Sequence, residues 1–154
     1  MAHWLLKTEP ETFGIDHLAG APRRTSTWDG VRNYQARNFL RDQVQRGEQA
    51  FLYHSSCAVP GIAGIVTVTR AAFPDPTAFD RKNKHFDADS DPAAPRWHAI
   101  EVRLTRRCQR IITLAELRAH GDGKLRGLTL LQRGNRLSVM PVSDAHWQFI
   151  LSLE

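Results

Sequence analysis

The chain has 154 residues, of which 42% are hydrophobic and 24% charged, so we expect one globular domain over residues 1–154 with a buried core. No apolar run approaches the roughly 18 residues of a membrane helix, which excludes a spanning segment. The 21 Lys and Arg residues outnumber the 16 Asp and Glu residues, giving a formal net charge of +5. This excess favours a polyanionic partner without requiring one.

The cysteines, the histidines and the N-terminal residues bear on location and metal binding. Two cysteines, Cys57 and Cys108, form neither a disulfide framework nor a cysteine-rich zinc site. Residues 1–7 lack the basic and long apolar regions of a secretory signal. We therefore expect an intracellular protein, cytoplasmic if it is bacterial. The Arg- and Ala-rich composition favours a bacterial origin. The seven histidines are scattered, and no metal site is expected.

Hydrophobic patterning predicts five or six strands and three or four short helices. The candidate strands are Trp4–Leu6, Thr25–Trp28, Ala50–His54, Ile62–Val68, Trp97–Leu104 and Leu137–Val142. The candidate helices are one turn over Phe13–Leu18, a helix between Asn33 and Gly47, a short helix starting at Thr113 and a last helix after Ser143. Strands gather in the middle of the chain, with helices between and after them. This order favours an α+β fold with a mixed, strongly bent sheet.

Local signals refine this reading. Asn33 and Ser143 stand where helix N-caps are expected. Gly61 and Gly64 leave room for close approach of a neighbouring backbone. Phe79–Pro95 is the longest irregular stretch, and such loops are usually functional or disordered.

Four segments at predicted strand ends combine hydroxyl, amide or carboxylate groups with Lys or Arg. They are Lys7–Pro10, Trp28–Asn33, His54–Cys57 and Arg133–Arg136. Loops at the strand ends of a bent sheet converge on one mouth, so we expect these segments to meet there. An aromatic face with a few fixed polar groups is suited to reading one flipped base, and arginines around it would hold phosphates.

The same segments resemble the EVE domain family, a PUA-like fold that includes the thymocyte nuclear protein type and is similar to YTH domains. The most specific block is the eleven-residue WDGVRNYQARN over Trp28–Asn38. The other matching stretches are Trp4–Pro10, Tyr53–Cys57 with Pro60–Gly64, Pro74–Thr77, Pro95–Trp97 and Leu131–Val139. The resemblance runs in order along essentially the whole chain.

This resemblance implies a PUA-like bent sheet or β-barrel with flanking helices and no cofactor. It implies a non-enzymatic module that reads a modified base, either a modified cytosine in DNA or a modified base in RNA. The implied base pocket consists of Trp28, Lys7, Thr8, Glu9, Asp29, Asn33, Ser55, Ser56 and Trp97. The implied contacts to the nucleic-acid backbone are Arg32, Arg37, Arg133, Asn135 and Arg136.

Several alternatives stay open. Trp28 is the implied cage aromatic, and its partner ring is Phe79, Phe86 or Trp97, while Tyr34 serves either the pocket or the helix core. Trp28 could instead belong wholly to the core; as a platform, we expect its replacement by Ala to abolish binding with little change in melting temperature. The other functions considered are an enzyme acting on nucleic acid, with Glu9 or Asp29 as a base near Ser55, and a module binding small molecules or proteins in the same pocket. The oligomeric state is left open.

Overall fold

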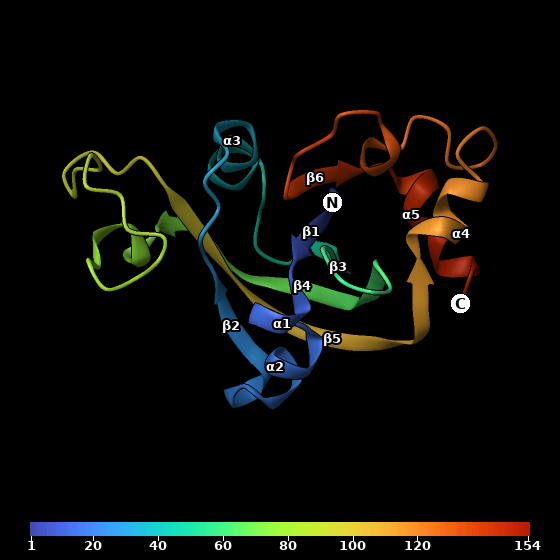
Figure 1. The fold of residues 1–154 in the computed structure, drawn as a ribbon, viewed down its shortest axis with the longest axis horizontal. Coiled ribbons are helices and arrows are strands. Elements are labelled where there is room, and N and C mark those ends of the chain that lie inside the picture. Colours follow the sequence, from blue (N-terminus) through green and yellow to red (C-terminus); the bar gives the residue numbers. More distant parts are fainter.

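The computed structural model describes all 154 residues and contains one six-stranded mixed sheet with short helices (Figure 1). The strands are β1 (His3–Thr8), β2 (Thr25–Trp28), β3 (Gln49–His54), β4 (Gly61–Pro74), β5 (His98–Thr113) and β6 (Val139–Val142). The α-helices are α1 (Pro10–Phe13), α2 (Ile15–Gly20), α3 (Tyr34–Asp42), α4 (Leu114–Ala119) and α5 (Asp144–Ser152). The 3₁₀ helices are η1 (Pro22–Arg24), η2 (Pro76–Phe79) and η3 (Thr129–Leu131). None of these helices combines the length and the apolar character needed to cross a bilayer.

The strands follow the order β2-β5-β4-β3-β1-β6, so β2 and β6 are the edges of an open sheet. β1 and β3 run parallel, and the other neighbouring pairs are antiparallel. The long pair β4 and β5 is interrupted by several shifts of register, and β5 bends sharply before it reaches α4 (Figure 1). Such irregularities bend a sheet locally. The expectation of an α+β fold with a bent mixed sheet and short helices is confirmed.

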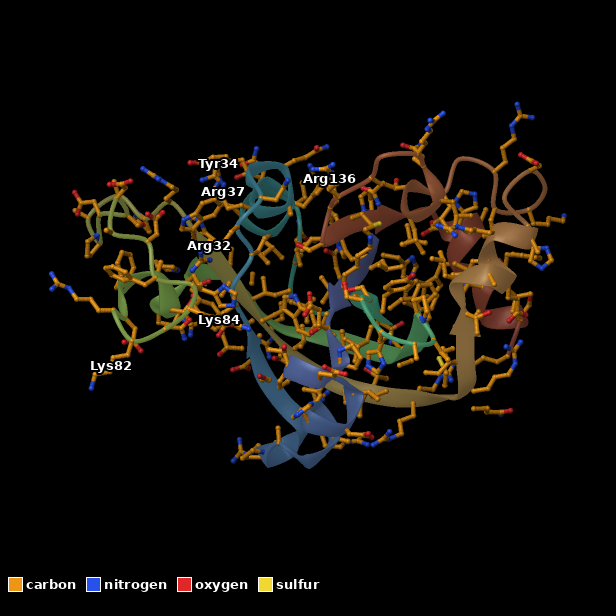
Figure 2. The ribbon with its side chains drawn as sticks, in the orientation of Figure 1. Arg32, Tyr34, Arg37, Lys82, Lys84 and Arg136 are labelled. Carbon is orange, nitrogen blue, oxygen red and sulfur yellow. The ribbon has the colours of Figure 1, made fainter.

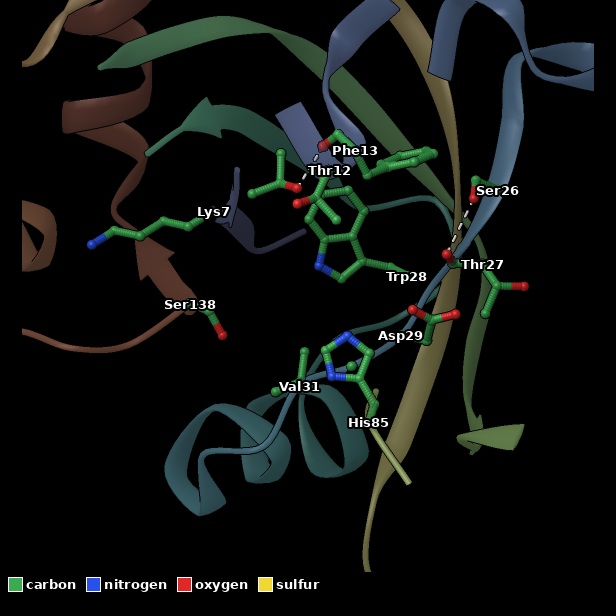
Figure 3. Close-up of a pocket in the computed structure, with 12 residues that line it drawn as sticks. Lys7, Thr12, Phe13, Ser26, Thr27, Trp28, Asp29, Val31, His85 and Ser138 are labelled. Atoms are coloured by element: carbon green, nitrogen blue, oxygen red, sulfur yellow. Dashed lines mark hydrogen bonds between the residues drawn. The ribbon is translucent and has the colours of Figure 1, made fainter. Parts of the chain in front are cut away.

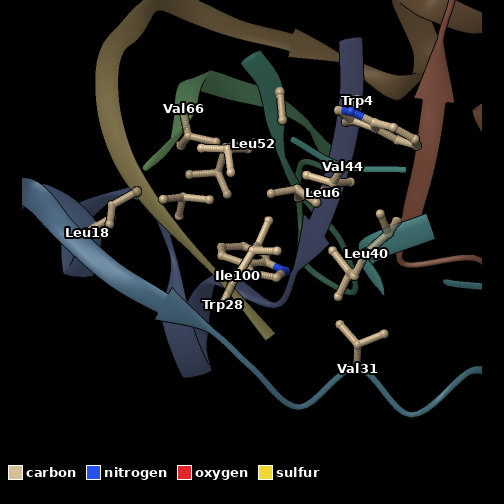
Figure 4. Packing of buried hydrophobic residues seen from close by; sticks show 14 of the residues in the cluster. Trp4, Leu6, Leu18, Trp28, Val31, Leu40, Val44, Leu52, Val66 and Ile100 are labelled. Carbon is tan, nitrogen blue, oxygen red and sulfur yellow. The ribbon is translucent and has the colours of Figure 1, made fainter. Parts of the chain in front are cut away.

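Both faces of the sheet are buried. Consecutive residues of β1 point to opposite sides of the sheet, and Trp4, Leu5 and Leu6 are all buried. Trp4 and Leu6 belong to one core cluster, which also takes in residues of α2 and α3 (Figure 4). Leu5 lies between them in the sequence and belongs to a second cluster, with Trp147 and Ile150 of α5. The short helices are therefore held in place by apolar contacts on each side of the sheet.

Residues 75–97, which we call the arm, project beyond the end of the β4–β5 pair (Figure 1). The arm contains η2 and otherwise consists of turns. At its base the Asp75 amide donates a hydrogen bond of 3.0 Å to the Trp97 carbonyl. The long irregular stretch predicted over Phe79–Pro95 is thus closed at its base, and it contacts the rest of the protein where Arg32 donates to the His85 carbonyl.

The predicted helix caps are confirmed, but some element boundaries differ. Asn33 accepts a hydrogen bond from the Ala36 amide, and Ser143 accepts one from the His146 amide. Helix α3 ends at Asp42 rather than near Gly47. The reason is the buried Glu48 carboxylate, which accepts hydrogen bonds from the Trp4 indole and from other groups and holds the chain after α3 in a turn.

Gly61 provides a test of the close backbone packing between β4 and β5. A Cβ added at Gly61 would clash with the Ile112 carbonyl oxygen. We expect Gly61→Ala to lower the free energy of unfolding by about 1–3 kcal/mol, the usual range for overpacking. Gly20→Ala is the matched control, because an added Cβ there meets no atom within 4 Å. Equal stability of the two variants in urea denaturation would contradict this account of the sheet.

Candidate nucleic-acid interface

A cavity of about 250 Å³ lies beside Trp28, and we call it the Trp28 cavity (Figure 3). It forms where β1, α1 and β2 meet the loop before α3 and the arm. Its apolar wall consists of Trp28, Phe13 and Val31. The other lining residues are Lys7, Thr8, Thr12, Ser26, Thr27, Asp29, Gly30, His85 and Ser138. The volume is enough for one nucleobase, and the wall combines one large aromatic surface with hydroxyl, carboxylate and amine groups.

Trp28 belongs both to the core and to the cavity wall. Its side chain is only 6% exposed and joins the cluster that contains Ile100 (Figure 4). The indole Nε1 of Trp28 makes no hydrogen bond. The only buried side-chain polar atom without a partner is Nδ1 of His98. The Trp28 Nε1 atom is therefore accessible to solvent. The indole N–H groups of Trp4 and Trp97, by contrast, donate to Glu48 and Asp87.

The dual placement of Trp28 changes one expectation drawn from the sequence. Replacing a buried tryptophan by alanine removes core contacts and costs about 3–5 kcal/mol. We therefore expect Trp28→Ala to lower the melting temperature markedly, whether or not a ligand binds. The earlier expectation of a nearly unchanged melting temperature does not fit a ring that is 6% exposed.

The second aromatic ring near Trp28 is Phe13 of α1, which was not among the predicted candidates. The two ring centroids are 6.2 Å apart, with the planes at 80°. This edge-to-face arrangement fixes the indole from one side but does not form a parallel sandwich. Phe79 and Phe86 do not line the cavity.

Three ionisable side chains give the Trp28 cavity its electrostatic character. Burial lowers the pKa of Lys7. Burial, together with the nearby charge of Asp75, raises the pKa of Asp29 although that residue is on the surface. Burial lowers the pKa of His85, and the positive charges of Arg32 and Lys84 lower it further. The cavity thus holds a carboxylate that accepts no hydrogen bond from another residue, beside an imidazole biased toward its neutral form.

A second cavity of about 340 Å³ adjoins the first, and we call it the Ser55 cavity. Seven residues line both: Lys7, Thr8, Thr12, Asp29, Gly30, His85 and Ser138. The Ser55 cavity adds Glu9, Ser55, Lys84, Arg136 and Leu137. All four polar segments singled out in the sequence contribute to its lining, which is the convergence that the strand-end positions predicted.

The loop that follows Trp28, the last residue of β2, is fixed to the arm by a buried carboxylate. Asp75 is 0% exposed and accepts hydrogen bonds from the Gly30 amide at 2.8 Å and from Arg32 Nη1 at 2.9 Å. Thr77 donates to the same carboxylate through its amide and its hydroxyl. Burial alone would raise the pKa of Asp75, but these hydrogen bonds together lower it.

Arg32, a predicted phosphate contact, has a structural role in this geometry. Besides Asp75 it donates to the Val31 carbonyl, the Thr77 hydroxyl and, twice, the His85 carbonyl. These bonds occupy all five donors of a guanidinium group. The structure leaves no Arg32 donor for a phosphate, and Arg32 instead connects the loop after β2 to the arm.

Several other predicted site residues lie outside the two cavities. Trp97 lines neither one; its N–H donates to Asp87 at 2.7 Å and its ring stacks on Tyr34. Ser56 is exposed in the turn after β3. Arg37 donates to the Arg96 carbonyl. The structure thus places Trp97 and Ser56, both predicted for the base pocket, outside the Trp28 and Ser55 cavities.

The remaining predicted residues border a third hollow of about 540 Å³, the Asn135 cavity. Asn33, Arg133, Asn135 and Arg136 contribute to its lining. Asn33 is occupied as the cap of α3, and Asn135 accepts a hydrogen bond from the Leu137 amide in its own turn. Arg136 lines both this hollow and the Ser55 cavity, and its side chain forms no ion pair or hydrogen bond within the protein.

Sequence reasoning missed several cavity residues, above all Phe13, His85, Lys84 and Ser138. Phe13 was assigned to a helical turn without a site role. His85 and Lys84 lie in the long irregular segment, and only the folding of the arm brings them to the cavity. The length of that segment was the one signal that pointed to function.

No group of three or more His, Cys, Asp or Glu residues lies close enough to hold a metal ion. The two cysteines are unpaired and half-buried. Burial raises the pKa of the Cys108 thiol to about 12, so the thiolate needed for nucleophilic or metal chemistry is disfavoured there.

The match to a family profile defines the class of the protein. Residues 2–153 match the EVE domain, and the chain belongs to that family. Human thymocyte nuclear protein 1 is 42% identical over 168 residues, which cover 99% of this chain and 74% of the human protein.

Solved structures agree with this assignment. The human THYN1 protein in complex with 5-methylcytosine-containing DNA superposes with a TM-score of 0.95 at 42% identity, covering 99% of this chain and 97% of that one. A protein from Pseudomonas putida gives a TM-score of 0.93 at 45% identity, with 99% of each chain covered. This chain therefore shares its fold with a protein whose structure was solved in complex with 5-methylcytosine-containing DNA.

Removing the Asp75 carboxylate tests whether it fixes the site loop. Asp75→Ala leaves the Arg32 guanidinium without its buried partner, and we expect the free energy of unfolding to fall by about 3–5 kcal/mol. Because the pKa of Asp75 is lowered, its carboxylate stabilises the fold above the ordinary value of 3.8, and this contribution is lost as the pH falls through the lower folded-state pKa. The difference between wild type and variant should therefore shrink below pH 3.8.

Asp42→Ala provides the control, since its ion pair with Arg41 is exposed on both sides and such pairs contribute little. Chemical denaturation followed by circular dichroism measures both variants. If Asp75→Ala proves as stable as Asp42→Ala at neutral pH, the buried network is not what holds the loop.

Proposed function

We propose that this protein binds DNA and holds one 5-methylcytosine, flipped out of the helix, in the Trp28 cavity. The observation that carries the proposal is a base-sized cavity, with an aromatic wall and a free carboxylate, in a chain whose fold matches a protein solved with 5-methylcytosine-containing DNA. An enzyme or binder that needs access to a single base takes it out of the stack, at a cost of a few kcal/mol. The Trp28 ring is positioned to recover part of that cost by stacking.

The polar groups of the cavity match the pairing edge of cytosine. This edge presents an amino donor at N4 and acceptors at N3 and O2. The Asp29 carboxylate is available to accept from N4, as acidic side chains do in reading cytosine. The Trp28 N–H and the Lys7 amine are donors among the lining groups. Thymine presents an acceptor in place of the N4 amino group and would face Asp29 unfavourably.

The methyl group itself contributes little discrimination. Burying one methyl is worth about 0.8 kcal/mol, or roughly fourfold in affinity. Phe13 and Val31 are the apolar side chains besides Trp28 that could receive it. Strong selectivity for cytosine over other bases should therefore come from the pairing edge, with a smaller added preference for the methylated form.

The rival functions are weaker on this geometry. An activated serine needs a base within hydrogen-bonding distance, whereas the Ser55 hydroxyl donates to the Thr8 carbonyl at 3.4 Å. A modified base in RNA, or a small molecule, would fit a cavity of this size equally well, so a panel of DNA and RNA oligonucleotides and nucleosides belongs in the first binding screen. We keep an intracellular location and a single domain over residues 1–154 as predictions.

The decisive comparison uses 5-methylcytosine and thymine at one position of the same duplex. Both bases carry the C5 methyl group, and each is placed opposite an abasic site, so neither has a base pair to break and they differ only in the pairing edge. We expect wild type to prefer 5-methylcytosine by about 5- to 150-fold, since a good base-edge contact is worth about 1–3 kcal/mol. Asp29→Asn should largely erase that preference, because an amide can turn its donor toward O4 of thymine. Fluorescence anisotropy measures all four affinities.

Asp122→Asn serves as the matched control, because Asp122 is exposed and lines neither the Trp28 nor the Ser55 cavity. It should retain the wild-type ratio. An unchanged ratio in Asp29→Asn would refute the assigned role of Asp29, and failure of wild type to bind any methylated duplex would refute the proposed function.

Salt dependence tests the cations at the mouth. Lys84 and Arg136 line the Ser55 cavity, are exposed, and form no ion pair within the protein. We expect Lys84→Ala and Arg136→Ala each to weaken binding equally for all sequences and to reduce the slope of log K against log salt by about 1. Lys124→Ala, an exposed lysine outside both cavities, should leave the slope unchanged. The same slope in all three variants would exclude Lys84 and Arg136 as phosphate contacts.

A further inference from the structure

Tyr34, the first residue of α3, is an exposed aromatic outside the proposed base site. It is 53% exposed, one of only four large hydrophobic side chains on the surface, and it lines neither the Trp28 nor the Ser55 cavity. Its ring does not serve the helix core, which Ala36 and Leu40 supply from the same helix. The structure therefore holds an aromatic face toward solvent without a core role.

The Tyr34 ring is supported from behind. It stacks on Trp97 with ring centroids 4.9 Å apart and an interplanar angle of 25°. Trp97 is itself 6% exposed and fixed by its hydrogen bond to Asp87. A ring held in this way loses little conformational freedom when a ligand stacks on it.

The outer face of the Tyr34 ring is open. The Arg37 Cζ atom lies 5.0 Å from the Tyr34 centroid and 6.0 Å from the Trp97 centroid. With the rings 4.9 Å apart, these distances place the guanidinium beside the stack and not on its outer face. Arg37 uses Nε and Nη1 in internal hydrogen bonds, while Nη2 makes none.

Positive groups connect this stack to the mouth of the proposed base site. The Arg32 Cζ atom lies 5.3 Å from the Trp97 ring centroid, and Arg32 donates to the His85 carbonyl. Lys84 directly precedes His85 in the arm. Figure 2 shows Tyr34, Arg37, Arg32 and Lys84 in succession along the side where α3 faces the arm. An exposed ring beside a free guanidinium donor matches the chemistry of a nucleotide, which offers a flat base and an adjacent phosphate.

We propose that the outer face of Tyr34 is a second base-stacking site, which takes an unpaired nucleobase of the DNA whose flipped base occupies the Trp28 cavity, with Arg37 Nη2 donating to an adjacent phosphate. This inference rests on the proposed function. Flipping one base leaves its former partner unpaired and weakens the neighbouring pairs, so a second base becomes available near the site. Stacking is indifferent to base identity because every base has a π face, so this site adds affinity without changing the preference for 5-methylcytosine.

The test uses duplexes with a central 5-methylcytosine and a single abasic site placed in turn opposite it and at each neighbouring position of either strand. We expect Tyr34→Ala to bind the intact duplex about 5- to 150-fold more weakly, as a stacking energy of about 1–3 kcal/mol implies. One abasic position should weaken wild type by a similar factor and have no effect on Tyr34→Ala. Tyr34→Phe keeps the ring and should bind within about twofold of wild type, whereas Tyr34→Leu, which lacks a π face, should behave as Tyr34→Ala.

Val59→Ala is the matched control, an exposed apolar side chain (55%) away from the stack, and it should bind as wild type. The second site is excluded if Tyr34→Ala and Tyr34→Leu bind the intact duplex as tightly as wild type. It is also excluded if every abasic position weakens these two variants as much as it weakens wild type. That result, combined with an intact 5-methylcytosine preference that Asp29→Asn erases, would overturn this inference alone. Absence of binding by wild type would overturn the proposed function and this inference together.

Discussion

The geometry of the candidate site depends on one buried carboxylate. Asp75 lies at the base of the arm and is 0% exposed, where an unpaired charge would be strongly disfavoured. It is tolerated because Gly30, Arg32 and Thr77 direct donors at it. Those same contacts hold the loop after β2 against the arm. The end of β2 supplies Trp28 to the Trp28 cavity, the loop after it supplies Asp29, and the arm supplies His85. The Asp75 network therefore holds together two sides of the cavity.

The arrangement at Gly30 illustrates how closely the loop and the arm approach. Gly30 has a φ of +76°, and a Cβ added there would lie 2.5 Å from Nε2 of His85. A left-handed conformation favours glycine, and a side chain there would displace the His85 ring. The Gly30 amide donates to Asp75, and the Gly30 backbone lies close to the His85 imidazole. Gly30 therefore connects the buried Asp75 network to the cavity wall.

The sequence predicted the sheet and the meeting of its polar loops, because both follow from local patterns. Alternation and turn residues located the strands, and polar groups at strand ends predicted the convergence that appears in the Ser55 cavity. The roles of single side chains could not be predicted in this way. Whether Arg32 meets a phosphate or Asp75 depends on contacts 43 residues apart in the chain, and Trp97 was displaced from the expected pocket by its bonds within the arm. These are tertiary contacts that no local spacing encodes.

The shared role of Trp28 constrains how the protein could achieve selectivity. A ring that is 6% exposed and packed in the core cannot move aside to enclose a base, so it offers one rigid surface. With Phe13 set edge-on at 80°, no second parallel ring completes a sandwich around a methyl group. The binding free energy gained by enclosing the methyl group is then limited to about 0.8 kcal/mol, the value for one buried methyl. The free carboxylate of Asp29 acts on a larger scale, because a mismatched polar group in a desolvated cavity loses a hydrogen bond and leaves the carboxylate unpaired. In the proposed function, the base edge thus decides which base is held, stacking and phosphate contacts set how tightly, and the methyl group adjusts the balance between two forms of the same base.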